Sequence, residues 1–364
     1  MTPAHRPAAP RAFAALDGLR GVAAVFVAMR HSVFFHGLGV HGGYMAVDLF
    51  FVLSGFVIAH AYERRLEAGL SPWRFIVLRY ARLWPVYLIG AVLGLIAAWL
   101  HALAPRDAMN AAQVIETAPF ALAMLPGPPI KPMLYPVDAV AWSLALELAI
   151  NAVYAFAWKP LRRPAVLAAT LALSALALIG AVAWFGTLDI GFEWRNAIGG
   201  VPRVVYSFTA GLALHRLHQA GVGRYAAPAW IWVALLAMVF VAQLDSVIAP
   251  LVCALALFPL FVFGAAGGVQ PGPRLARLFL ALGAMSYPLY AIHKPLGSLA
   301  VLAARRYAPA LMSAPPVLVG IPYILLVIGL SLAIERFYDL PVRRWLSALT
   351  QPRRAPPLTA SPPA

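Results

Sequence analysis

The stretch GLRGVAAVFVAMRH, from Gly18 to His31, is almost wholly apolar, yet it carries Arg20, Arg30 and His31. With its flanks it is long enough to cross the hydrocarbon core of a membrane, which takes about 20 helical residues. A charge at the centre of such a helix costs about 2.5–3.5 kcal/mol on insertion scales, so charged side chains there face a protein interior or a wet cavity. The stretch therefore predicts a membrane helix that carries functional groups.

The whole chain has the composition of a membrane protein. Of its 364 residues, 62% are hydrophobic and 11% are charged, and the mean hydropathy is +0.81. This charged share is less than half the roughly 25% usual in soluble domains. The composition predicts an all-α, polytopic integral membrane helical bundle whose solvent includes a lipid bilayer.

Charge and cysteine content exclude several classes of protein. The net charge is +15, but the basic residues form short clusters between apolar runs, which orients a membrane protein and does not predict a nucleic-acid partner. Cys253 is the single cysteine, so a disulfide or a cysteine metal site within one chain is excluded. No helix shows the His and Glu spacing of a zinc site, and we expect no metal.

Apolar runs between helix breakers predict about ten membrane spans. We place them near residues 13–34, 45–62, 83–103, 138–158, 164–185, 197–214, 226–244, 247–266, 278–303 and 316–338. With the N-terminus inside, 19 of the 28 Lys and Arg residues fall in inner segments, five in outer segments and four within spans. This bias predicts that both termini are cytoplasmic.

The sequence predicts one membrane domain between two short tails. Residues 1–12 are expected to be a cytoplasmic tail, 13–347 the membrane domain, and 348–364 a disordered cytoplasmic tail rich in Pro and Ala. The longest connection, 105–137, contains an apolar piece at 118–125 that could touch the membrane edge. The first apolar run lacks a small-residue cleavage site, so we expect it to remain as a helix.

Two spans near the N-terminus place ionisable groups close together. Arg20 and His31 are 11 residues apart, about three helical turns, and so share a helix face. Arg30 lies on a neighbouring face, as a functional group or as an anchor that reaches the membrane surface. Asp48 opens the next span, and it either orients His31 as a general base or caps its own helix.

The third and fourth spans add a basic face and an acidic one. Arg79 and Arg82 are three residues apart and share a face that could bind anionic phosphates from the cytosol or anionic lipid headgroups. In the fourth span Ser143 and Glu147 also share a face. Glu147 could partner His31, bind a proton or pair with Arg203.

The ninth span, in the stretch SYPLYAIHKPL, predicts a polar pocket. Pro288 and Pro295 free backbone carbonyls, and His293 and Lys294 lie in the outer half of the span. A histidine satisfied by its own surroundings is the simpler alternative. Arg20, Arg79 and Arg82 are expected towards the cytoplasm, whereas His31, Asp48, Arg203, His293 and Lys294 are expected towards the outside.

Six stretches occur in an order that resembles a known family. They are LDGLRGVAAVFVAMRH, GYMAVDLFFVLSGF, FIVLRYARLWPVYL, WSLALELAINAVY, SYPLYAIHKPL and ERFYDLPVRRW. Together they are similar to the membrane-bound acyltransferase-3 family, the bacterial O-acyltransferases that modify sugars. The resemblance runs from about residue 14 to 347, which would make the membrane domain a transmembrane acyltransferase domain in the bacterial inner membrane.

The resemblance implies a donor, an acceptor and residue roles. The donor would be acyl-CoA, with acetyl-CoA as the expected form, used as a co-substrate from the cytoplasm. The acceptor would be a hydroxyl of a carbohydrate or lipid-linked glycan. His31 would be the essential histidine, with Asp48 or Glu147 completing the catalytic set. Arg20, Arg79 and Arg82 would bind the donor. Trp142 and Ser143, which with Glu147 match the family's Trp-Ser-x-x-x-Glu-like stretch, would contact the substrate. Apart from the resemblance, their places inside apolar spans make Arg203, His293 and Lys294 further candidates for the substrate site, with Lys294 or Arg203 stabilising the oxyanion.

Several alternatives stay open from the sequence. His31 could act as a general base or form an acyl-histidine intermediate. Buried Arg, His and Glu with proline-broken helices also suit a secondary transporter of a small anionic or sugar-like substrate. A structural subunit of an envelope-polysaccharide assembly is a third reading. Because few residues follow the last span, we expect a transferase without an appended esterase-like domain.

Overall fold

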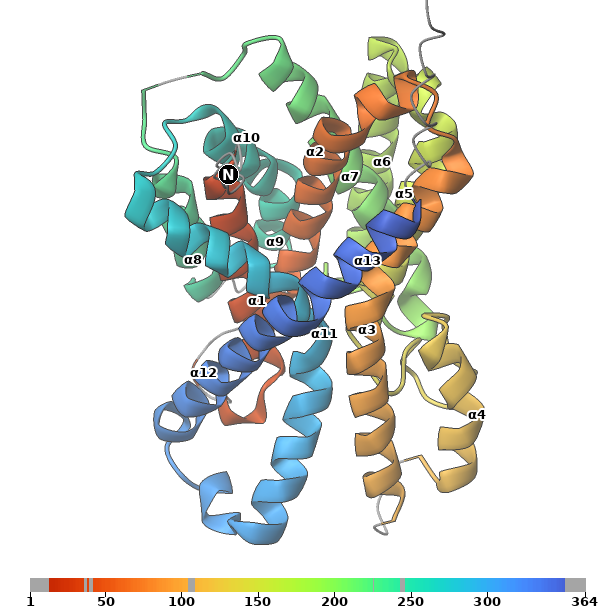
Figure 1. Cartoon of the computed structure of the whole chain (residues 1–364), viewed down its shortest axis with the longest axis vertical. Coiled ribbons are helices and arrows are strands. Elements are labelled where there is room, and N and C mark those ends of the chain that lie inside the picture. The colour runs from red at the N-terminus through yellow and green to blue at the C-terminus, as the bar shows by residue number, and fades with distance from the viewer. Residues whose placement is uncertain are drawn as a thin grey trace, which may run out of the picture.

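The computed structural model describes residues 13–35, 38, 42–103, 109–224, 226–242 and 246–350, with side chains to residue 346. Throughout these ranges the chain is built from helices, and the β-structure there is limited to two isolated bridges. Figure 1 shows the helices gathered into an elongated bundle. The prediction of an all-α, polytopic membrane bundle is confirmed.

Thirteen α-helices are formed within the described residues. They are α1 Ala14–His31, α2 Ala46–Glu67, α3 Pro72–Ala102, α4 Ala111–Leu122, α5 Ala141–Leu161, α6 Pro164–Phe185, α7 Gly200–Gln219, α8 Trp230–Val241, α9 Ile248–Val252, α10 Phe258–Gly267, α11 Pro273–Tyr307, α12 Pro316–Ile334 and α13 Leu340–Thr350. A π-helical turn joins α9 to α10 over Cys253–Leu257, and another joins α12 to α13 over Glu335–Asp339.

Each expected span corresponds to a helical segment. In the part of the chain that the structure describes, eight such segments are long and apolar enough to cross a membrane. The remaining two expected spans are occupied by α1, whose 18 residues include three charged side chains, and by α8, which has 12 residues. The charges in α1 lower its apolarity, as the opening stretch of the sequence indicated.

Several helix ends differ from the prediction. Helix α3 begins at Pro72 instead of residue 83, because Ser71 caps it by accepting the Arg74 backbone N–H at 3.3 Å and proline suits the first turn. Helix α4 begins at Ala111, ahead of the apolar piece at 118–125, behind an Asn110–Gln113 capping box. Helix α13 continues to Thr350, past the expected end at 347, and the rest of both expected tails lies outside the described residues.

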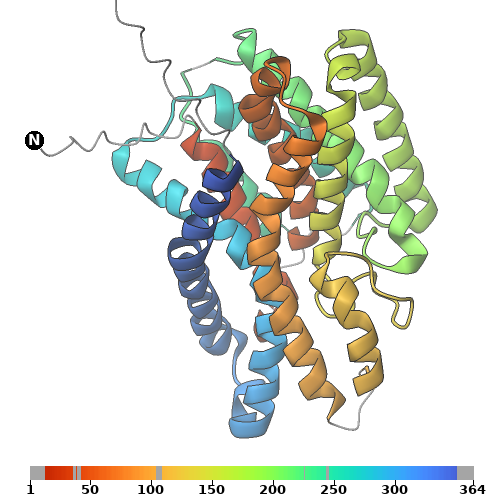
Figure 2. The same ribbon diagram turned by 45° about the vertical axis from the view of Figure 1, so that its right-hand side comes forward.

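Close helix packing forms the centre of the bundle, and apolar helices form its periphery. Helix α1 packs against α11, and α2 packs against α7. Gly55 and Gly211 allow the second contact, because a Cβ atom on either would collide with the backbone of the other helix. Helices α6 and α12 lie at opposite edges in Figure 2, and they expose Leu173, Trp184 and Leu325 as lipid-facing helices do.

Helix α11 changes direction near the middle of its length, as Figure 1 shows. Pro288 and Pro295 lie in this region, and each removes a backbone hydrogen bond of the helix. The segment that follows Pro288 carries Tyr290 and His293, both of which are buried. The bend therefore shapes the part of α11 that faces α1 and α3.

Candidate active site

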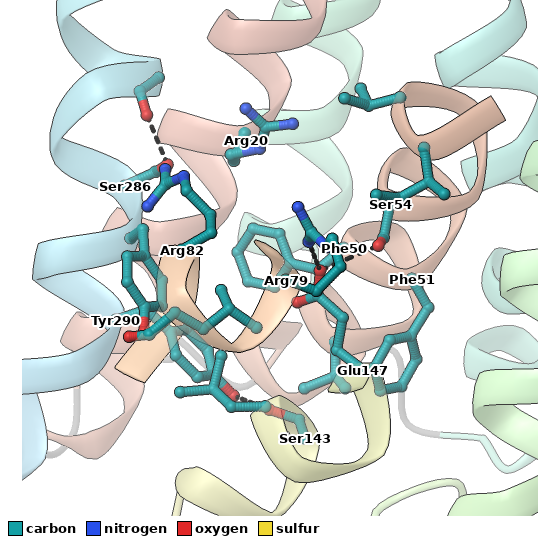
Figure 3. A pocket seen from close by; sticks show the side chains of 17 residues that line it. Arg20, Phe50, Phe51, Ser54, Arg79, Arg82, Ser143, Glu147, Ser286 and Tyr290 are labelled. Carbon is teal, nitrogen blue, oxygen red and sulfur yellow. Dashed lines mark hydrogen bonds and ion pairs between the residues drawn. The ribbon is translucent and has the colours of Figure 1, made fainter. Parts of the chain in front are cut away.

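Five helices converge on a cavity of about 210 Å³ in the centre of the bundle. Its polar lining comes from α1, α2, α3, α5 and α11, and consists of Arg20, Ser54, Arg79, Arg82, Ser143, Glu147, Ser286, Tyr287 and Tyr290. Figure 3 shows the arginines on one side of the cavity and Ser143 on the opposite side. Four of the residues selected from the sequence for donor binding or catalysis thus share one cavity: Arg20, Arg79, Arg82 and Glu147.

Glu147 is held by two donors. Arg79 Nη2 donates to Glu147 Oε1 at 3.1 Å, and Ser54 Oγ donates to the same oxygen at 2.9 Å (Figure 3). The side chains of Arg79 and Glu147 are 13% and 19% exposed, so both still reach the cavity surface. Of the three alternatives for Glu147, the pairing with Arg203 is not found, since Arg79 pairs with Glu147 and Arg203 pairs with Asp48.

Arg82 belongs to a second ionic network, at the junction of α12 and α13. Arg82 Nη1 lies 3.5 Å from Asp339 Oδ2, and Arg343 lies 2.8 Å from the same oxygen. Arg343 also pairs with Glu335 at 2.6 Å. Asp339 is completely buried in the π-helical turn, so this turn fixes a carboxylate that orients Arg82 towards the cavity.

The far end of the cavity is closed by a hydroxyl pair. Ser143 Oγ and Tyr290 Oη lie 2.6 Å apart, and Ser143 Oγ also donates to the Val140 carbonyl at 3.1 Å. The Tyr290 ring packs edge to face against the His293 ring, with the two ring centres 5.8 Å apart. The residues that line the cavity do not include His31 or His293, so Tyr290 separates the arginines from the histidines.

His31 and His293 form a pair between α1 and α11. His31 Nδ1 lies 3.3 Å from His293 Nε2 and 2.9 Å from the Val27 carbonyl oxygen. The Nδ1 atom of His293 lies 3.1 Å from the Leu289 carbonyl and 2.9 Å from the Tyr290 carbonyl. The sequence selected both histidines but did not pair them, because 262 residues separate them.

The carboxylate expected beside His31 has other partners. Asp48 accepts from Arg203 through both oxygens, at 3.1 Å and 2.7 Å, and Glu147 accepts from Arg79 and Ser54. In the described residues, the hydrogen-bonding neighbours of the His31 ring are the Val27 carbonyl and His293. Neither carboxylate contacts the His31 ring in this structure, so the predicted pairing of Asp48 or Glu147 with His31 is not found there; the ring lies beside a second imidazole instead.

Arg203 is a structural residue in this arrangement. Its remaining nitrogens donate to the Ile190 carbonyl at 2.7 Å and the Tyr44 carbonyl at 3.2 Å, and its guanidinium lies 5.4 Å from the centre of the Trp142 ring. The side chains of Arg203 and Asp48 are both 0% exposed. Each guanidinium nitrogen thus has an acceptor within the protein, which leaves Arg203 no free donor for an oxyanion. Trp142 is absent from the cavity lining, and its contact with substrate stays a prediction.

Arg30 lies in the last turn of α1, and Lys294 lies in the C-terminal half of α11. Lys294 is half-buried and acts electrostatically on Asp138, a buried residue in the segment that precedes α5. Burial raises the pKa of Asp138 to about 7, and the Val140 backbone and Lys294 oppose that shift. Arg30 pairs with Asp189 at 2.8 Å and lies over the Tyr44 ring, so protein groups hold its guanidinium.

Sequence reasoning missed several residues that shape the site. Asp339 and Arg343 lie in the quoted stretch ERFYDLPVRRW, and Tyr290 lies in SYPLYAIHKPL, yet none of them was given a role. Asp17, which pairs with Arg20 at 3.2 Å, was also overlooked. The signal for Asp339 was present, because an acidic residue inside an apolar span needs a partner.

Comparisons with known proteins identify the family. The model of the family described as an acyltransferase domain matches residues 13–336. The chain is 38% identical over 191 residues to "Protein 2 in picA locus" of Rhizobium radiobacter, an alignment that covers 48% of this chain and 97% of that protein. No solved structure matches the chain. The chain belongs to the acyltransferase-3 family and is a multi-pass membrane enzyme that transfers acyl groups other than aminoacyl groups.

Proposed function

We propose that the protein transfers an acyl group, in the simplest case acetyl, from acyl-CoA to a hydroxyl of a carbohydrate or lipid-linked glycan at the bacterial inner membrane. The observation that carries this proposal is the convergence of Arg20, Arg79 and Arg82 on one cavity that ends beside a histidine pair. Guanidinium groups bind phosphate oxygens through several donors, and an imidazole suits proton abstraction from a hydroxyl.

The size of the cavity favours a donor with a narrow reactive arm. A volume of about 210 Å³ is below the roughly 300–1,000 Å³ of sites that enclose a whole small ligand. The nucleotide of CoA therefore stays at the arginine side, and only the thin pantetheine arm and its thioester enter. Along α1, 11 residues separate Arg20 from His31, a rise of roughly 16 Å, which a long flexible arm can span.

The reaction is a balanced acyl transfer. His31 takes the proton of the acceptor hydroxyl while the oxygen attacks the thioester carbonyl. An ester C–O bond forms, the C–S bond breaks, and the proton passes from His31 to the departing thiolate, which leaves as free CoA. Lys294 is near enough to act electrostatically on His31, and we assign it the stabilisation of the oxyanion.

This mechanism requires Tyr290 to move. The tyrosine closes the cavity through its 2.6 Å contact with Ser143, and its ring covers His293. Rotation of the Tyr290 side chain would open the path from the arginines to the histidines without a change in the helices. The Ser143 hydroxyl would then lie beside the path along which the thioester moves towards His31.

The test is release of free CoA by purified protein in nanodiscs. With acetyl-CoA and a glycan acceptor, the unaltered enzyme should release CoA in proportion to ester formed. His31→Ala should lower that rate by about 10²–10⁴-fold, the contribution of a positioned general base. Arg224→Ala, five residues beyond the end of α7, is a control, because Arg224 is absent from the cavity lining. Undiminished activity of His31→Ala would refute the proposed base.

A further inference from the structure

The tautomeric state of the two histidines follows from their surroundings. A carbonyl oxygen offers only lone pairs, so a ring nitrogen about 3 Å from it must carry a proton for the contact to be attractive. The Nδ1 atom of His293 faces two carbonyls, those of Leu289 and Tyr290, at 3.1 Å and 2.9 Å. In the neutral ring the proton of His293 therefore lies on Nδ1, and Nε2 is an acceptor.

The same reasoning applies to His31. Its Nδ1 atom lies 2.9 Å from the Val27 carbonyl and 3.3 Å from His293 Nε2, which are both acceptors. The neutral His31 ring therefore carries its proton on Nδ1, shared between these two acceptors. This leaves the lone pair on Nε2, the nitrogen that points away from both of them.

We propose that His293 is the positioning residue of the reaction: together with the Val27 carbonyl it holds His31 in the Nδ1–H form, so that Nε2 is the atom that takes the acceptor proton. This inference rests on the proposed function, because it assumes that His31 is the base. When Nε2 accepts the proton, the Nδ1–H of the resulting imidazolium still donates to His293 Nε2. In Ser-His-Asp sites a carboxylate accepts from Nδ1–H and fixes the tautomer of the catalytic histidine. Here the His293 imidazole takes the place of that carboxylate.

Among the residues that the structure describes, the two carboxylates considered for His31 have other partners, which supports this assignment. Asp48 is held by Arg203, and Glu147 is held by Arg79 and Ser54. A neutral acceptor also suits the site, because it adds no negative charge to the interior of a membrane helix bundle. Tyr323 fixes the backbone at this point by donating to the His293 carbonyl at 3.1 Å, and His293 is only 2% exposed, so its ring has a fixed orientation.

Three substitutions of His293 separate positioning from packing. A glutamine side chain can place its amide oxygen near the position of Nε2, whereas an asparagine amide reaches only the position of Nδ1. Phenylalanine fills the space of the ring without an acceptor. We expect His293→Gln to keep kcat within a few fold, and His293→Asn and His293→Phe to lower kcat by about 10–100-fold, the loss typical of a partner that acts through a histidine. KM for acyl-CoA should stay unchanged in all three.

The kinetics are compared on equal amounts of folded protein, which size-exclusion profiles and thermal midpoints check. They decide whether His293 positions His31 or only fills space. Rescue by glutamine alone supports an acceptor at Nε2. Equal loss in all three variants would overturn the proposal in favour of packing, and so would full activity of His293→Phe.

A second measurement reads the tautomer directly and does not depend on activity. Solid-state 15N NMR of histidine-labelled protein in bilayers distinguishes a protonated from an unprotonated ring nitrogen. The chain has nine histidines, and the difference spectrum against His31→Gln assigns the His31 signals. We expect a protonated Nδ1, an unprotonated Nε2 and a coupling through the hydrogen bond from His31 Nδ1 to His293 Nε2. A protonated Nε2 in neutral His31 would overturn the inference. An active His31→Ala enzyme would instead overturn the proposed function, and the tautomer measured for His31 would still stand.

Discussion

Arg203 and the cavity arginines Arg79 and Arg82 are the same residue type inside the same membrane bundle, yet they have different roles. Arg203 is 0% exposed and donates to one carboxylate and two backbone carbonyls, which account for all three guanidinium nitrogens. The side chains of Arg79 and Arg82 are 13% and 33% exposed, and they line a cavity. The difference shows that a buried charge in a membrane helix is structural where the protein satisfies it completely and available for binding where a cavity reaches it.

The largest effect is expected from breaking the Arg203–Asp48 pair. Arg203→Met leaves the Asp48 carboxylate buried without its counter-ion, which costs about 3–5 kcal/mol in comparable proteins. We expect a strong loss of folded protein and a lower thermal midpoint in detergent. Replacing both partners, as Asp48→Leu with Arg203→Met, should recover much of the stability. A stable, folded Arg203→Met single variant with weak substrate binding would place Arg203 among the binding residues instead.

Removal of Arg82 should affect binding and leave folding nearly intact. Arg82→Ala deletes one charge-assisted donor that we propose for the CoA phosphates, worth about 1.5–3 kcal/mol, so KM for acyl-CoA should rise by roughly 10–100-fold. Asp339 keeps its 2.8 Å contact with Arg343, which limits the loss of stability. Arg74→Ala, on the same helix but absent from the cavity lining, is the matched control. An unchanged KM would exclude Arg82 from the donor site.

Substitution of Glu147 tests whether this residue limits donor binding by the cavity arginines. Its carboxylate occupies Arg79 and adds negative charge where we expect phosphates to approach. Glu147→Gln keeps the shape and removes the charge, so KM for acyl-CoA should fall by a few fold while kcat changes little. Steady-state kinetics at constant ionic strength measure this, since surface and rim charges are screened by salt. A fall in kcat with unchanged KM would instead give Glu147 a part in the chemistry.

Asp138 provides a smaller test, through the pH dependence of stability. Burial raises the pKa of Asp138 from 3.8 to about 7, so the folded state holds its proton where the unfolded chain has lost it. Stability is therefore unaffected below about pH 4 and falls as the pH rises from there to about 7. Asp138→Asn should raise the thermal midpoint at about pH 8 and have little effect at about pH 4. Equal effects at both pH values would contradict the buried, protonated carboxyl.

The helices were predictable from the sequence because the length of an apolar run can be read from one continuous stretch of residues. Ten expected spans correspond to helical segments, including α1 despite its charges. Helix ends were less predictable: α3 begins at Pro72 because of a cap on Ser71, a polar signal that the apolar count ignored. The topology derived from Arg and Lys counts stays a prediction.

Site residues were predictable as a set but not as pairs. Arg20, Arg79, Arg82 and Glu147 meet in one cavity because charges in membrane helices must face inward. The pairing of Asp48 with Arg203, and of His31 with His293, depends on the contacts of α2 with α7 and of α1 with α11. Such contacts join residues 155 and 262 positions apart, which no spacing rule along a single helix can anticipate.

The central claim is that a donor anchored by the cavity arginines delivers its acyl group past Tyr290 to His31. A cryo-electron microscopy structure with a thioether analogue of acetyl-CoA, which cannot transfer its acyl group, tests this most directly. We expect the pyrophosphate against Arg79 and Arg82, the Tyr290 side chain rotated away from Ser143, and the analogue's carbonyl carbon beside His31 Nε2. An analogue bound with Tyr290 still closed on Ser143 and its acyl end away from His31 would contradict the account.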